Sequence, residues 1–527
     1  MGPPSEPVLG DCDGATVDVP SKWRGAKVTS GVATMTEGVP VQDAACQSLY
    51  KDSAHAQTDD ITATKAMSGV TDEELVEFLR RTAPTMIQAL NENNSSSAFD
   101  EPEDLADDRQ ATVECVHVLN PFGVAEDGTV PSGAGAAGDP RLQELECTSI
   151  SWNCMGGVVA AAFGRFDVEG WCTYPGALCT WNLQRSEVNP NKPDAVVELD
   201  SCLMCCAFHP KHPALVAGGT YNGELYIWDL SRDDVQRGKS QVSDATHREP
   251  ISQVAWKYDS DLASKHSRTE EAYQIITVGA DGRVLVWLWQ KLDHPVYGYE
   301  LVKEVPGTHK MVLWGGTSIA FSEGSADDRG TFVVGTEGGS VYKCFMHHNE
   351  HMANEFVEDI ASGEGLKLRT PIKSTYEGHA GPVHGVDCSS FQRNLFMTCG
   401  ADGTARVYNV LQAKPVVVLE PSEVYLFSVR WSPFRPLVCA VAAGDGRVFI
   451  YDLAASMLHP VKSIDVTGRR APVHAISFNP KLKQYLAAGD GPRVKVYEMG
   501  PRLTEARAQE QRMADRLAEM EGANEEE

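Results

Sequence analysis

Four side chains of the kinds used in hydrolytic relays occur close together in the sequence: His379, Thr398, Asp402 and Tyr408. A hydroxyl, an imidazole and a carboxylate can together activate a nucleophile. The pattern, however, predicts that His379 lies in a loop, Thr398 in a strand, Asp402 in a turn and Tyr408 at the end of the next strand. A nucleophile should be exposed beside an oxyanion hole, and no pocket motif accompanies these residues. We therefore interpret them as a buried hydrogen-bond tetrad that ties a loop to a sheet, with the complete set in this repeat alone.

Three other motifs resemble binding sites but lack the context that such sites need. Residues 133–138 match G-x-G-x-x-G, yet no strand precedes them and no helix follows to direct its N-terminus at a phosphate. Residues 238–240 read Gly-Lys-Ser, but Asp233 stands where a P-loop needs its first glycine. Cys202 and Cys205 have zinc-like spacing without a second ligand pair nearby. We expect no catalytic residue, cofactor or metal site.

The elements that would position these residues are repeats. A glycine is followed five residues later by a large residue, with alternating apolar residues between them, as expected of a strand that leaves a tight turn. One repeat has Lys343 in place of the aromatic residue, which indicates either a loosened strand or a contact point. The pairs are Gly176/Trp181, Gly223/Trp228, Gly282/Trp287, Gly338/Lys343, Gly403/Tyr408, Gly446/Tyr451 and, with one extra residue, Gly491/Tyr497.

Upstream of each glycine lies a short apolar strand and then a strand that ends in small residues. The first of these strands ends at Trp152, Phe208, Trp256, Phe321, Cys388, Trp431 and Phe478. This unit is typical of a WD-repeat blade of about 40–45 residues. Because one blade cannot bury both of its faces, blades stack in a ring, and seven copies predict an all-β, seven-bladed WD-repeat β-propeller. We expect residues 113–119 to supply the missing last strand and close the ring; the alternative is an isolated edge strand.

Composition limits the classes of partner. The net charge of −27 argues against nucleic acid and against an anionic membrane surface as partners. No apolar run approaches the ~20 residues that span a bilayer, and the N-terminus lacks a secretory signal. The 14 cysteines are therefore expected to be reduced and mostly buried, in a cytoplasmic protein.

The terminal regions differ from the repeats. Residues 1–110 contain 20 acidic and 8 basic residues, which predicts a largely disordered tail. We divide the chain into an acidic tail with light-chain-binding motifs (1–70), an amphipathic helix (71–94), a linker (95–110), the propeller (111–497) and a charged C-terminal helix or tail (498–527). We expect this last segment to be solvated.

The expected helix has a capping box at residues 71–74 and a possible kink at Pro84. Its apolar stripe needs a partner, either the propeller or, as we favour, a groove in another protein. The stripe consists of Leu75, Phe78, Leu79, Met86, Ile87 and Leu90.

The sequence also resembles a known family. Residues 145–153 (LECTSISWN), 179–183 (CTWNL) and 425–433 (YLFSVRWSP) are similar to segments of the dynein intermediate chains. Residues 391–396 (FQRNLF) and 335–339 (GTEGG) resemble the branch that serves retrograde intraflagellar transport in cilia and flagella. The resemblance covers the propeller and the helix before it.

The resemblance implies a subunit of a motor complex, without enzymatic activity of its own, in the cytoplasm, on the cytoskeleton and at the cilium and basal body. Dimeric light chains would join its tail to that of a second intermediate chain, and train proteins of intraflagellar transport are possible further partners. The apolar stripe resembles a roadblock-type light-chain site. The residues that resemble a hub-type light-chain site, where a peptide adds as a strand to a sheet edge, are Val41, Gln42, Ala56, Gln57, Thr58 and Asp59.

The resemblance further implies that the propeller binds the tail of the dynein heavy chain. The residue four before each strand-end marker should lie near one rim of the ring: Thr148, Met204, Ser252, Thr317, His384, Phe427 and His474. Aromatic residues that become buried at an interface dominate its binding energy, so we expect Tyr425 and Phe427 to be exposed anchors; the alternative is that they pack inside the propeller. The heavy-chain-binding candidates are Met204, His384, Tyr425, Phe427 and His474. The alternative function is a generic WD-repeat adaptor in trafficking or ubiquitin ligation.

Overall fold

A computed structural model of the chain describes residues 76–84, 86–87, 111–122, 142, 144–185, 187–265, 269–305, 310–322, 330–346, 368–468, 471–507 and 510–520. The hub-type motif residues Val41, Gln42 and 56–59 lie outside the described residues, as do Leu75 and Leu90 at the ends of the apolar stripe. The chain divides into two units, residues 1–99 and residues 100–527.

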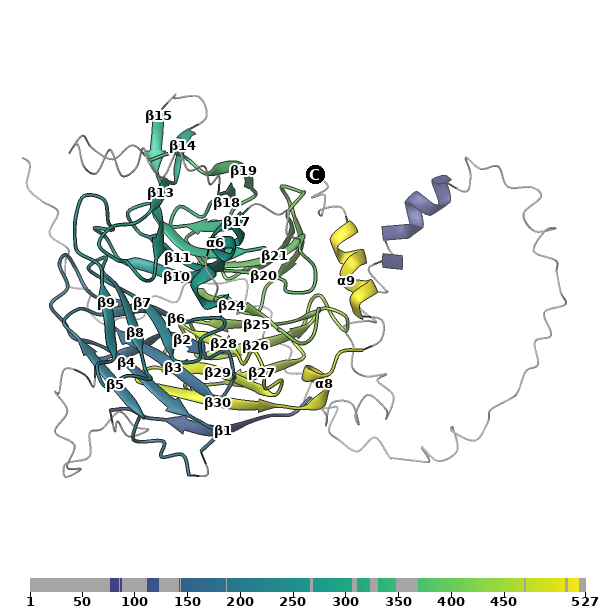
Figure 1. The fold of residues 1–527 in the computed structure, drawn as a ribbon. Coiled ribbons are helices and arrows are strands. Elements are labelled where there is room, and N and C mark those ends of the chain that lie inside the picture. The colour runs from purple at the N-terminus through teal and green to yellow at the C-terminus, as the bar shows by residue number, and fades with distance from the viewer. Residues whose placement is uncertain are drawn as a thin grey trace, which may run out of the picture. The chain divides into compact units, whose positions relative to one another are not determined.

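Seven four-stranded antiparallel sheets form the second unit (Figure 1), which confirms the predicted all-β, seven-bladed propeller. Blades 1 to 3 consist of β2 (Glu146–Trp152), β3 (Val158–Gly164), β4 (Gly176–Asn182) and β5 (Ala195–Leu199); β6 (Leu203–Phe208), β7 (Leu215–Thr220), β8 (Leu225–Asp229) and β9 (Gln236–Lys239); and β10 (Ile251–Tyr258), β11 (Tyr273–Gly279), β12 (Arg283–Leu288) and β13 (Tyr297–Glu300).

Blades 4 to 6 follow the same order along the chain. They consist of β16 (Gly316–Phe321), β17 (Thr331–Thr336), β18 (Val341–Phe345) and β19 (Ile372–Tyr376); β20 (Val383–Cys388), β21 (Leu395–Gly400), β22 (Ala405–Asn409) and β23 (Pro415–Leu419); and β24 (Leu426–Trp431), β25 (Val438–Ala443), β26 (Arg447–Asp452) and β27 (Lys462–Asp465). Two insertions are seen among the described residues: α6 (Ser260–Lys265) with a 3-10 turn (Thr269–Ala272) in blade 3, and the hairpin β14 (Val302–Val305) and β15 (Lys310–Leu313) before blade 4.

Blade 7 joins the two ends of the propeller. It contains β28 (Ile476–Phe478), β29 (Tyr485–Asp490), β30 (Arg493–Met499) and, as its outer strand, β1 (Val113–Leu119). β1 runs antiparallel to β30, from Val113 opposite Met499 to Leu119 opposite Val494. On the inner side, β2 of blade 1 contacts both β6 of blade 2 and β28 of blade 7. The chain therefore reaches across the whole repeat array to complete its last sheet.

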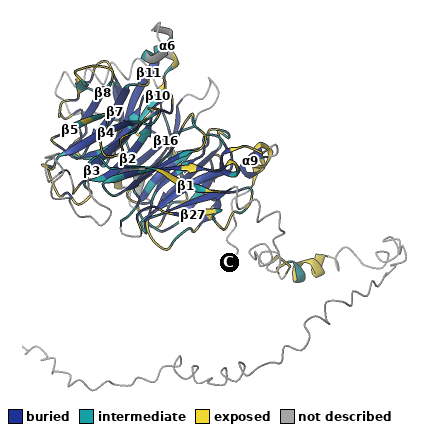
Figure 2. Cartoon of the chain, turned by 90° about the horizontal axis from the view of Figure 1, so that it is seen from below, coloured by how far each residue is buried: buried dark blue, intermediate teal, exposed yellow. Residues whose placement is uncertain are grey.

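The second strand of each blade is buried between its neighbours, which explains its small residues. β7 has the sequence LVAGGT and all six of its residues are buried. A Cβ atom at Gly218 would lie 2.6 Å from the ring of Trp228 in the neighbouring strand, so this glycine permits a close approach. Figure 2 shows the strands of the sheets mostly as buried.

The sequence-based assignment of blade 4 is wrong by one residue. The glycine with a positive φ angle in its turn is Gly339 (φ 83°), not Gly338. The residue that corresponds to the strand-end aromatics is therefore the buried Cys344. Lys343 points the other way, and its ammonium donates a hydrogen bond to the carbonyl of Val410 in blade 5 at 3.3 Å. Because Gly338 and Gly339 are consecutive, the spacing of glycine and large residue could not show which of the two occupies the turn.

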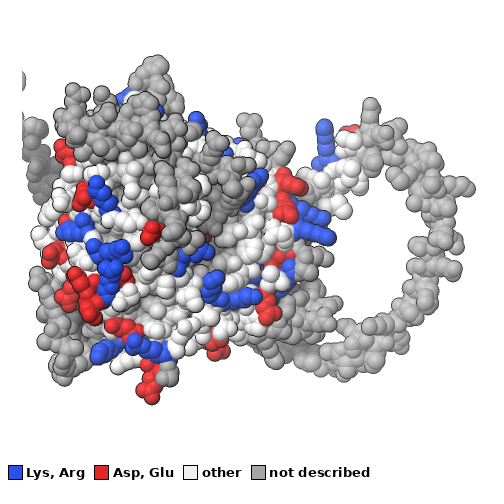
Figure 3. Space-filling view, in the orientation of Figure 1, with Lys and Arg blue, Asp and Glu red and all other residues white. Residues whose placement is uncertain are grey.

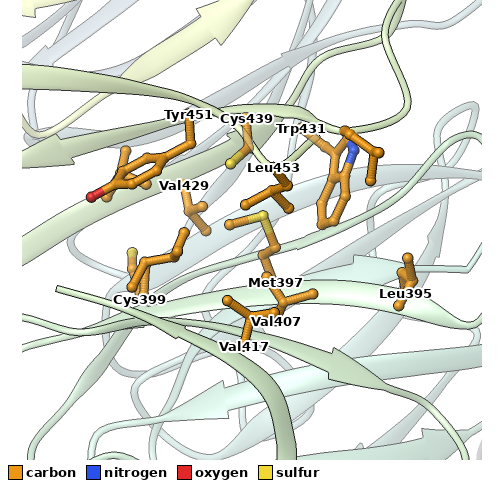
Figure 4. Close-up of a cluster of buried hydrophobic side chains, with 14 of the residues drawn as sticks. Leu395, Met397, Cys399, Val407, Val417, Val429, Trp431, Cys439, Tyr451 and Leu453 are labelled. Atoms are coloured by element: carbon orange, nitrogen blue, oxygen red, sulfur yellow. The ribbon is translucent and has the colours of Figure 1, made fainter. Parts of the chain in front are cut away.

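Buried side chains of blades 5 and 6 pack into one cluster (Figure 4). Residues near the C-terminus belong to the same cluster. Met397, Val407 and Val417 of blade 5 and Val429 and Trp431 of blade 6 belong to this cluster. Ala514, Leu517 and Ala518 of α9 (Glu510–Glu519) complete it. The expectation of a solvated C-terminal tail is thus wrong, because the apolar face of α9 is part of the core.

An ionic contact holds the same C-terminal segment in place. The guanidinium of Arg435, which is fully buried, binds the carboxylates of Asp452 (3.0 Å) and Glu510. It also donates to the carbonyl of Arg502 in α8 (Pro501–Thr504). Glu510, one of the charged residues that suggested a solvated tail, is therefore the partner of a buried arginine.

In the first unit, residues 76–84 and 86–87 are helical, so helix lies on both sides of Thr85. Phe78, Leu79, Met86 and Ile87 of the predicted stripe are exposed. Among the described residues of the whole chain, no helix is long and apolar enough to cross a bilayer. The described cysteines are free thiols, and most of them are buried.

Candidate functional site

The tetrad in blade 5 forms a buried network of hydrogen bonds. His379 Nδ1 lies 2.9 Å from a carboxylate oxygen of Asp402, and its Nε2 lies 2.7 Å from the hydroxyl of Thr398. The hydroxyl of Tyr408 donates to the carbonyl of Glu377 at 2.6 Å. The side chain of His379 is 0% exposed, so the imidazole cannot reach a solvent-borne substrate. The network connects the loop before blade 5 to β21 through Thr398, to the following turn through Asp402 and to β22 through Tyr408.

The pKa values of the tetrad follow from burial and from these contacts. Burial lowers the pKa of His379 below 6.5, although the nearby Asp402 opposes the shift. Burial would raise the pKa of Asp402, but hydrogen bonds from His379 and Thr404 outweigh it and hold the pKa at about 2. Burial raises the pKa of Tyr408 to about 12. A neutral imidazole that donates to a carboxylate is the arrangement consistent with these directions.

A second tetrad occurs in blade 3, which corrects the expectation of a single complete set. His247 Nδ1 lies 3.0 Å from Asp281, and His247 Nε2 lies 2.7 Å from the hydroxyl of Thr277. The indole N–H of Trp287 donates to the same hydroxyl at 3.0 Å. The sequence signal was present in the Asp281-Gly282 turn, but His247 stands 34 residues before Asp281, against 23 residues between His379 and Asp402. The longer insertion concealed the match.

The seven predicted rim residues come together around the central channel. Thr148, Met204, Ser252, Thr317, His384, Phe427 and His474 all line one cavity of about 100 Å³. Six of them, all except His474, sit at a β-bulge between the first two strands of their blade. A bulge re-aims one side chain, and here it turns the side chain toward the channel. The structure thus gathers the seven residues predicted for one rim around a single cavity.

Three of these bulge residues link neighbouring blades. The hydroxyl of Thr148 donates to the carbonyl of Leu203 at 2.7 Å, and that of Ser252 donates to Gly316 at 2.8 Å. Thr317 donates in the same way to Val383. In each case the acceptor directly precedes the bulge residue of the next blade. Met204, His384 and Phe427 carry no hydroxyl and present sulfur, imidazole or ring atoms to the channel instead.

Aromatic rings form a continuous row at this channel mouth, which we call the aromatic arc: His384, Phe427, His474 and Phe166. Ring centroids lie 5.1 Å apart for His384 and Phe427, 4.6 Å for Phe427 and His474, and 4.1 Å for His474 and Phe166. Burial lowers the pKa of His384, and His474 adds to that effect. His474 lies 3.4 Å from the carboxylate of Glu146. Of the candidates, Tyr425 is the most exposed, at 59%.

Sequence reasoning missed the loop of residues 165–175, between β3 and β4. Phe166, Trp171 and Tyr174 in this loop are 46%, 64% and 41% exposed. Three aromatic residues in a segment without strand periodicity were the available signal. Acidic and basic side chains alternate over the described surface in Figure 3, and among the described residues no cluster could hold a metal ion.

Comparisons with known proteins agree with this architecture. The family model "WD domain, G-beta repeat" matches residues 197–229 and 370–409, the second of which contains the blade 5 tetrad. A mouse protein, cytoplasmic dynein 2 intermediate chain 2, is 37% identical over 516 residues, covering 95% of this chain and 90% of the relative. The human protein of the same name is 39% identical over 458 residues, covering 84% of this chain and 79% of the relative.

Proposed function

Because the chain belongs to the family of dynein intermediate chains, we propose that it is a non-catalytic subunit of a dynein motor complex that drives retrograde intraflagellar transport and supports cilium assembly. The observation that carries this proposal is the similarity to the dynein 2 intermediate chains along 95% of the chain, tail included. The protein would act in the cytoplasm, on the cytoskeleton and at the cilium and basal body.

In this proposal the propeller binds the tail of the heavy chain through the channel mouth and its surroundings. ATP hydrolysis takes place in the heavy chain and not in this subunit. Met204, His384, Phe427 and His474 line the channel mouth, and Tyr425 is exposed close by in the sequence. An array of β-bulges that turns six side chains to one place supplies a rigid platform. The buried tetrads support the platform without taking part in chemistry.

The N-terminal tail would bind dimeric light chains and, through them, the tail of a second intermediate chain. The hub-type site would use Val41, Gln42 and residues 56–59, and the roadblock-type site would use the stripe from Leu75 to Leu90. The exposed Phe78, Leu79, Met86 and Ile87 support the second site, because an apolar helix face needs a partner. Two weak sites on dimeric partners hold together by effective concentration.

Co-purification from cells that express the tagged full chain tests this assignment. We expect Gln57→Ala with Thr58→Ala to release the hub-type light chain, and Phe78→Asp with Leu79→Asp to release the roadblock-type light chain. Each variant should keep the other light chain. Matched controls are Gln47→Ala with Ser48→Ala in the tail and Arg80→Asp on the helix. If neither light chain accompanies the unaltered protein, the proposed role of the tail is wrong.

A further inference from the structure

Blades 5 to 7 carry a basic surface, although the chain as a whole has a net charge of −27. The turns that connect the first strand to the second, and in blades 5 and 6 the third strand to the fourth, contain no acidic residue; they span residues 389–394, 410–414, 432–437, 453–461 and 479–484. The exposed lysine and arginine side chains of these turns and of α9 form what we call the basic patch. They are Arg393, Lys414, Lys481, Lys483, Arg512 and Arg516.

Contacts between neighbouring elements show that the basic patch is continuous. The ammonium of Lys483 in blade 7 lies 6.0 Å from the centroid of the Phe434 ring in blade 6. α9 begins at that same turn of blade 6, where it pairs with the buried arginine. Its later residues bond to the turns of blade 5 through the side chains of Gln392 and Gln412, which are close in sequence to the two patch residues of that blade. The patch therefore follows α9 from blade 7 to blade 5.

The acidic side chains of this region do not offset the cations of the patch. Glu510 is buried against Arg435, and the carboxylate of Asp515 accepts from two glutamine amides. Among the described residues of α9 and of the segment between α8 and α9, Glu505 and Glu519 are the exposed carboxylates. Six exposed cations against two exposed carboxylates leave a positive surface, which attracts an acidic segment.

An acidic segment of this chain joins the propeller at the edge of the patch. Residues 100–108 (DEPEDLADD) contain six acidic residues and no basic one, and they lie outside the described residues. The carbonyl of Thr112 accepts from the N–H of Gly500 at 2.7 Å, where α8 begins beside the start of β1 (Figure 1). The N–H of Met499 donates to the carbonyl of Gln484 at 2.7 Å, at the end of the blade 7 turn that belongs to the patch. The acidic segment is therefore tethered next to the patch.

The segment is long enough and charged enough to contact the patch. Nine extended residues span about 30 Å, whereas the ten residues of α9 span about 15 Å. One exposed ion pair contributes no more than about 1 kcal/mol, so the same segment as a free peptide would bind weakly. A short tether, however, gives an effective concentration in the millimolar range. Several weak pairs are then enough to hold the segment on the surface.

A second acidic segment follows α9. Residues 521–527 contain four glutamates and leave the blade 5 end of the helix, away from Lys481 and Lys483 of blade 7. Residues 100–108 carry more carboxylates and are tethered at the blade 7 end, beside these two lysines. Charge and position both favour the segment before β1 as the occupant of the patch.

We propose that residues 100–108 dock on the basic patch and so fix the path along which the N-terminal tail leaves the propeller. The contact is electrostatic, and dissolved salt weakens it. It lies within one chain, so the inference goes beyond the proposed function and does not depend on it.

Carbodiimide cross-linking of the purified full chain, followed by mass spectrometry, tests the proposal, because this reagent joins a carboxylate to a lysine only when the two are in contact. The patch variant combines Arg512→Glu with Arg516→Glu and keeps Lys414 and Lys483 as reporters. Thermal unfolding checks that the variant folds, which we expect because both arginines are exposed.

Two further variants separate charge complementarity from other effects. The matched control combines Lys192→Glu with Lys211→Glu, at exposed positions in turns of blades 1 and 2. The rescue variant adds Asp107→Lys and Asp108→Lys to the patch variant, which restores opposite charges on the two sides of the contact.

In dilute salt we expect cross-links from residues 100–108 to Lys483 and to Lys414. Their yield should fall on the order of threefold or more in about 1 M salt, where the screening length is about 3 Å. The patch variant should show a similar loss, the control should match the unaltered chain, and the rescue variant should recover the yield.

Three results would overturn the inference and leave the proposed function intact. The first is an equal yield at both salt concentrations and in the patch variant, which would show that the tether alone brings the groups together. The second is cross-linking of Lys414 and Lys483 to residues 521–527 in place of residues 100–108. The third is cross-linking between chains in a mixture of isotopically labelled and unlabelled protein, which would assign the patch to a second copy.

Discussion

At the scale of single residues, the tetrad hydroxyl is found in two blades of the described propeller, the same two that carry the tetrad histidine. Thr277 and Thr398 supply the hydroxyl in blades 3 and 5. The strand registers place smaller or apolar residues at the equivalent position of the other blades: Ala161, Gly218, Val334, Val441 and Ala488. The indole N–H groups of Trp181 and Trp228 consequently have no hydrogen-bond partner among the described residues, although both are buried. These blades lack the tetrad hydrogen bonds and rely more on packing.

This difference predicts a stabilising substitution. Ala161→Ser places a hydroxyl beside Trp181, which can accept from the indole N–H as Thr277 accepts from Trp287. The new hydroxyl can donate to the carbonyl of Cys179, as Thr277 donates to that of Leu285. We expect a gain of about 1 kcal/mol in unfolding free energy, measured by denaturant titration. The adjacent Ala160→Ser is the control and should destabilise, because Ala160 packs in a different apolar cluster.

The tetrad histidine of blade 5 predicts a loss of stability at mildly acidic pH. The folded-state pKa of His379 lies below its ordinary value of 6.5, so below that pH the unfolded chain binds a proton that the folded chain does not. Stability should therefore fall as pH decreases from 7 to 5.5. Asp402, with a pKa of about 2, lowers the unfolding free energy further only when the pH falls below 3.8, the ordinary pKa of an aspartate.

Denaturant titrations at pH 7 and pH 5.5 measure this effect. His379→Gln should reduce the difference in unfolding free energy between the two pH values, whereas His459→Gln, at an exposed site, should leave it unchanged. Equal pH dependence in the unaltered protein and in His379→Gln would show that this histidine does not contribute. His384, whose pKa burial also lowers, accounts for part of the loss that remains.

At the scale of elements, the C-terminal helix behaves as a part of blades 5 and 6. Arg435→Ala would leave the carboxylates of Asp452 and Glu510 buried without their cation. We expect it to cost about 3–5 kcal/mol of unfolding free energy. The control in the same blade is Arg447→Ala, whose partly exposed pair with Asp445 should contribute no more than about 1 kcal/mol. Similar costs for the two variants would mean that the buried network does not hold α9.

The closing strand yields a second prediction at this scale. Deletion of residues 111–120 removes β1 and exposes the edge of β30, so the melting temperature of the propeller should fall. Deletion of residues 2–35 keeps β1 and is the control. An unchanged melting curve after loss of β1 would mean that the ring does not depend on this strand.

Local pattern and long-range contact explain which elements were predictable. The turn glycines and alternating strands are encoded within each repeat, so the blade number and class follow from sequence periodicity. The partnership of Glu510 with Arg435, 75 residues apart, and that of His247 with Asp281 depend on how the chain returns in space. The many charged residues of the C-terminal segment suggested a solvated tail. Nothing in the sequence near Glu510 shows that its partner is an arginine buried in blade 6.

At the scale of the whole molecule, seven sheets that are incomplete alone form a closed ring. Inner-strand bulges in six blades, together with His474 of blade 7, then bring seven side chains to one channel mouth. Alignment of the repeats predicted these residues as a set but did not predict the channel. The aromatic loop of residues 165–175 was not anticipated, because its position depends on Asn222 and Tyr221 of the next blade. The result is a rigid propeller with an exposed aromatic face, preceded in the chain by a segment with an apolar helix stripe.

The central claim is that this chain serves as the intermediate chain of a dynein motor. Quantitative mass spectrometry of the tagged full chain, purified from the cells that naturally produce it, tests that claim most directly. We predict a dynein heavy chain in an amount comparable to that of the tagged chain, together with hub-type and roadblock-type light chains. A purified complex that contains no dynein heavy chain would contradict the account.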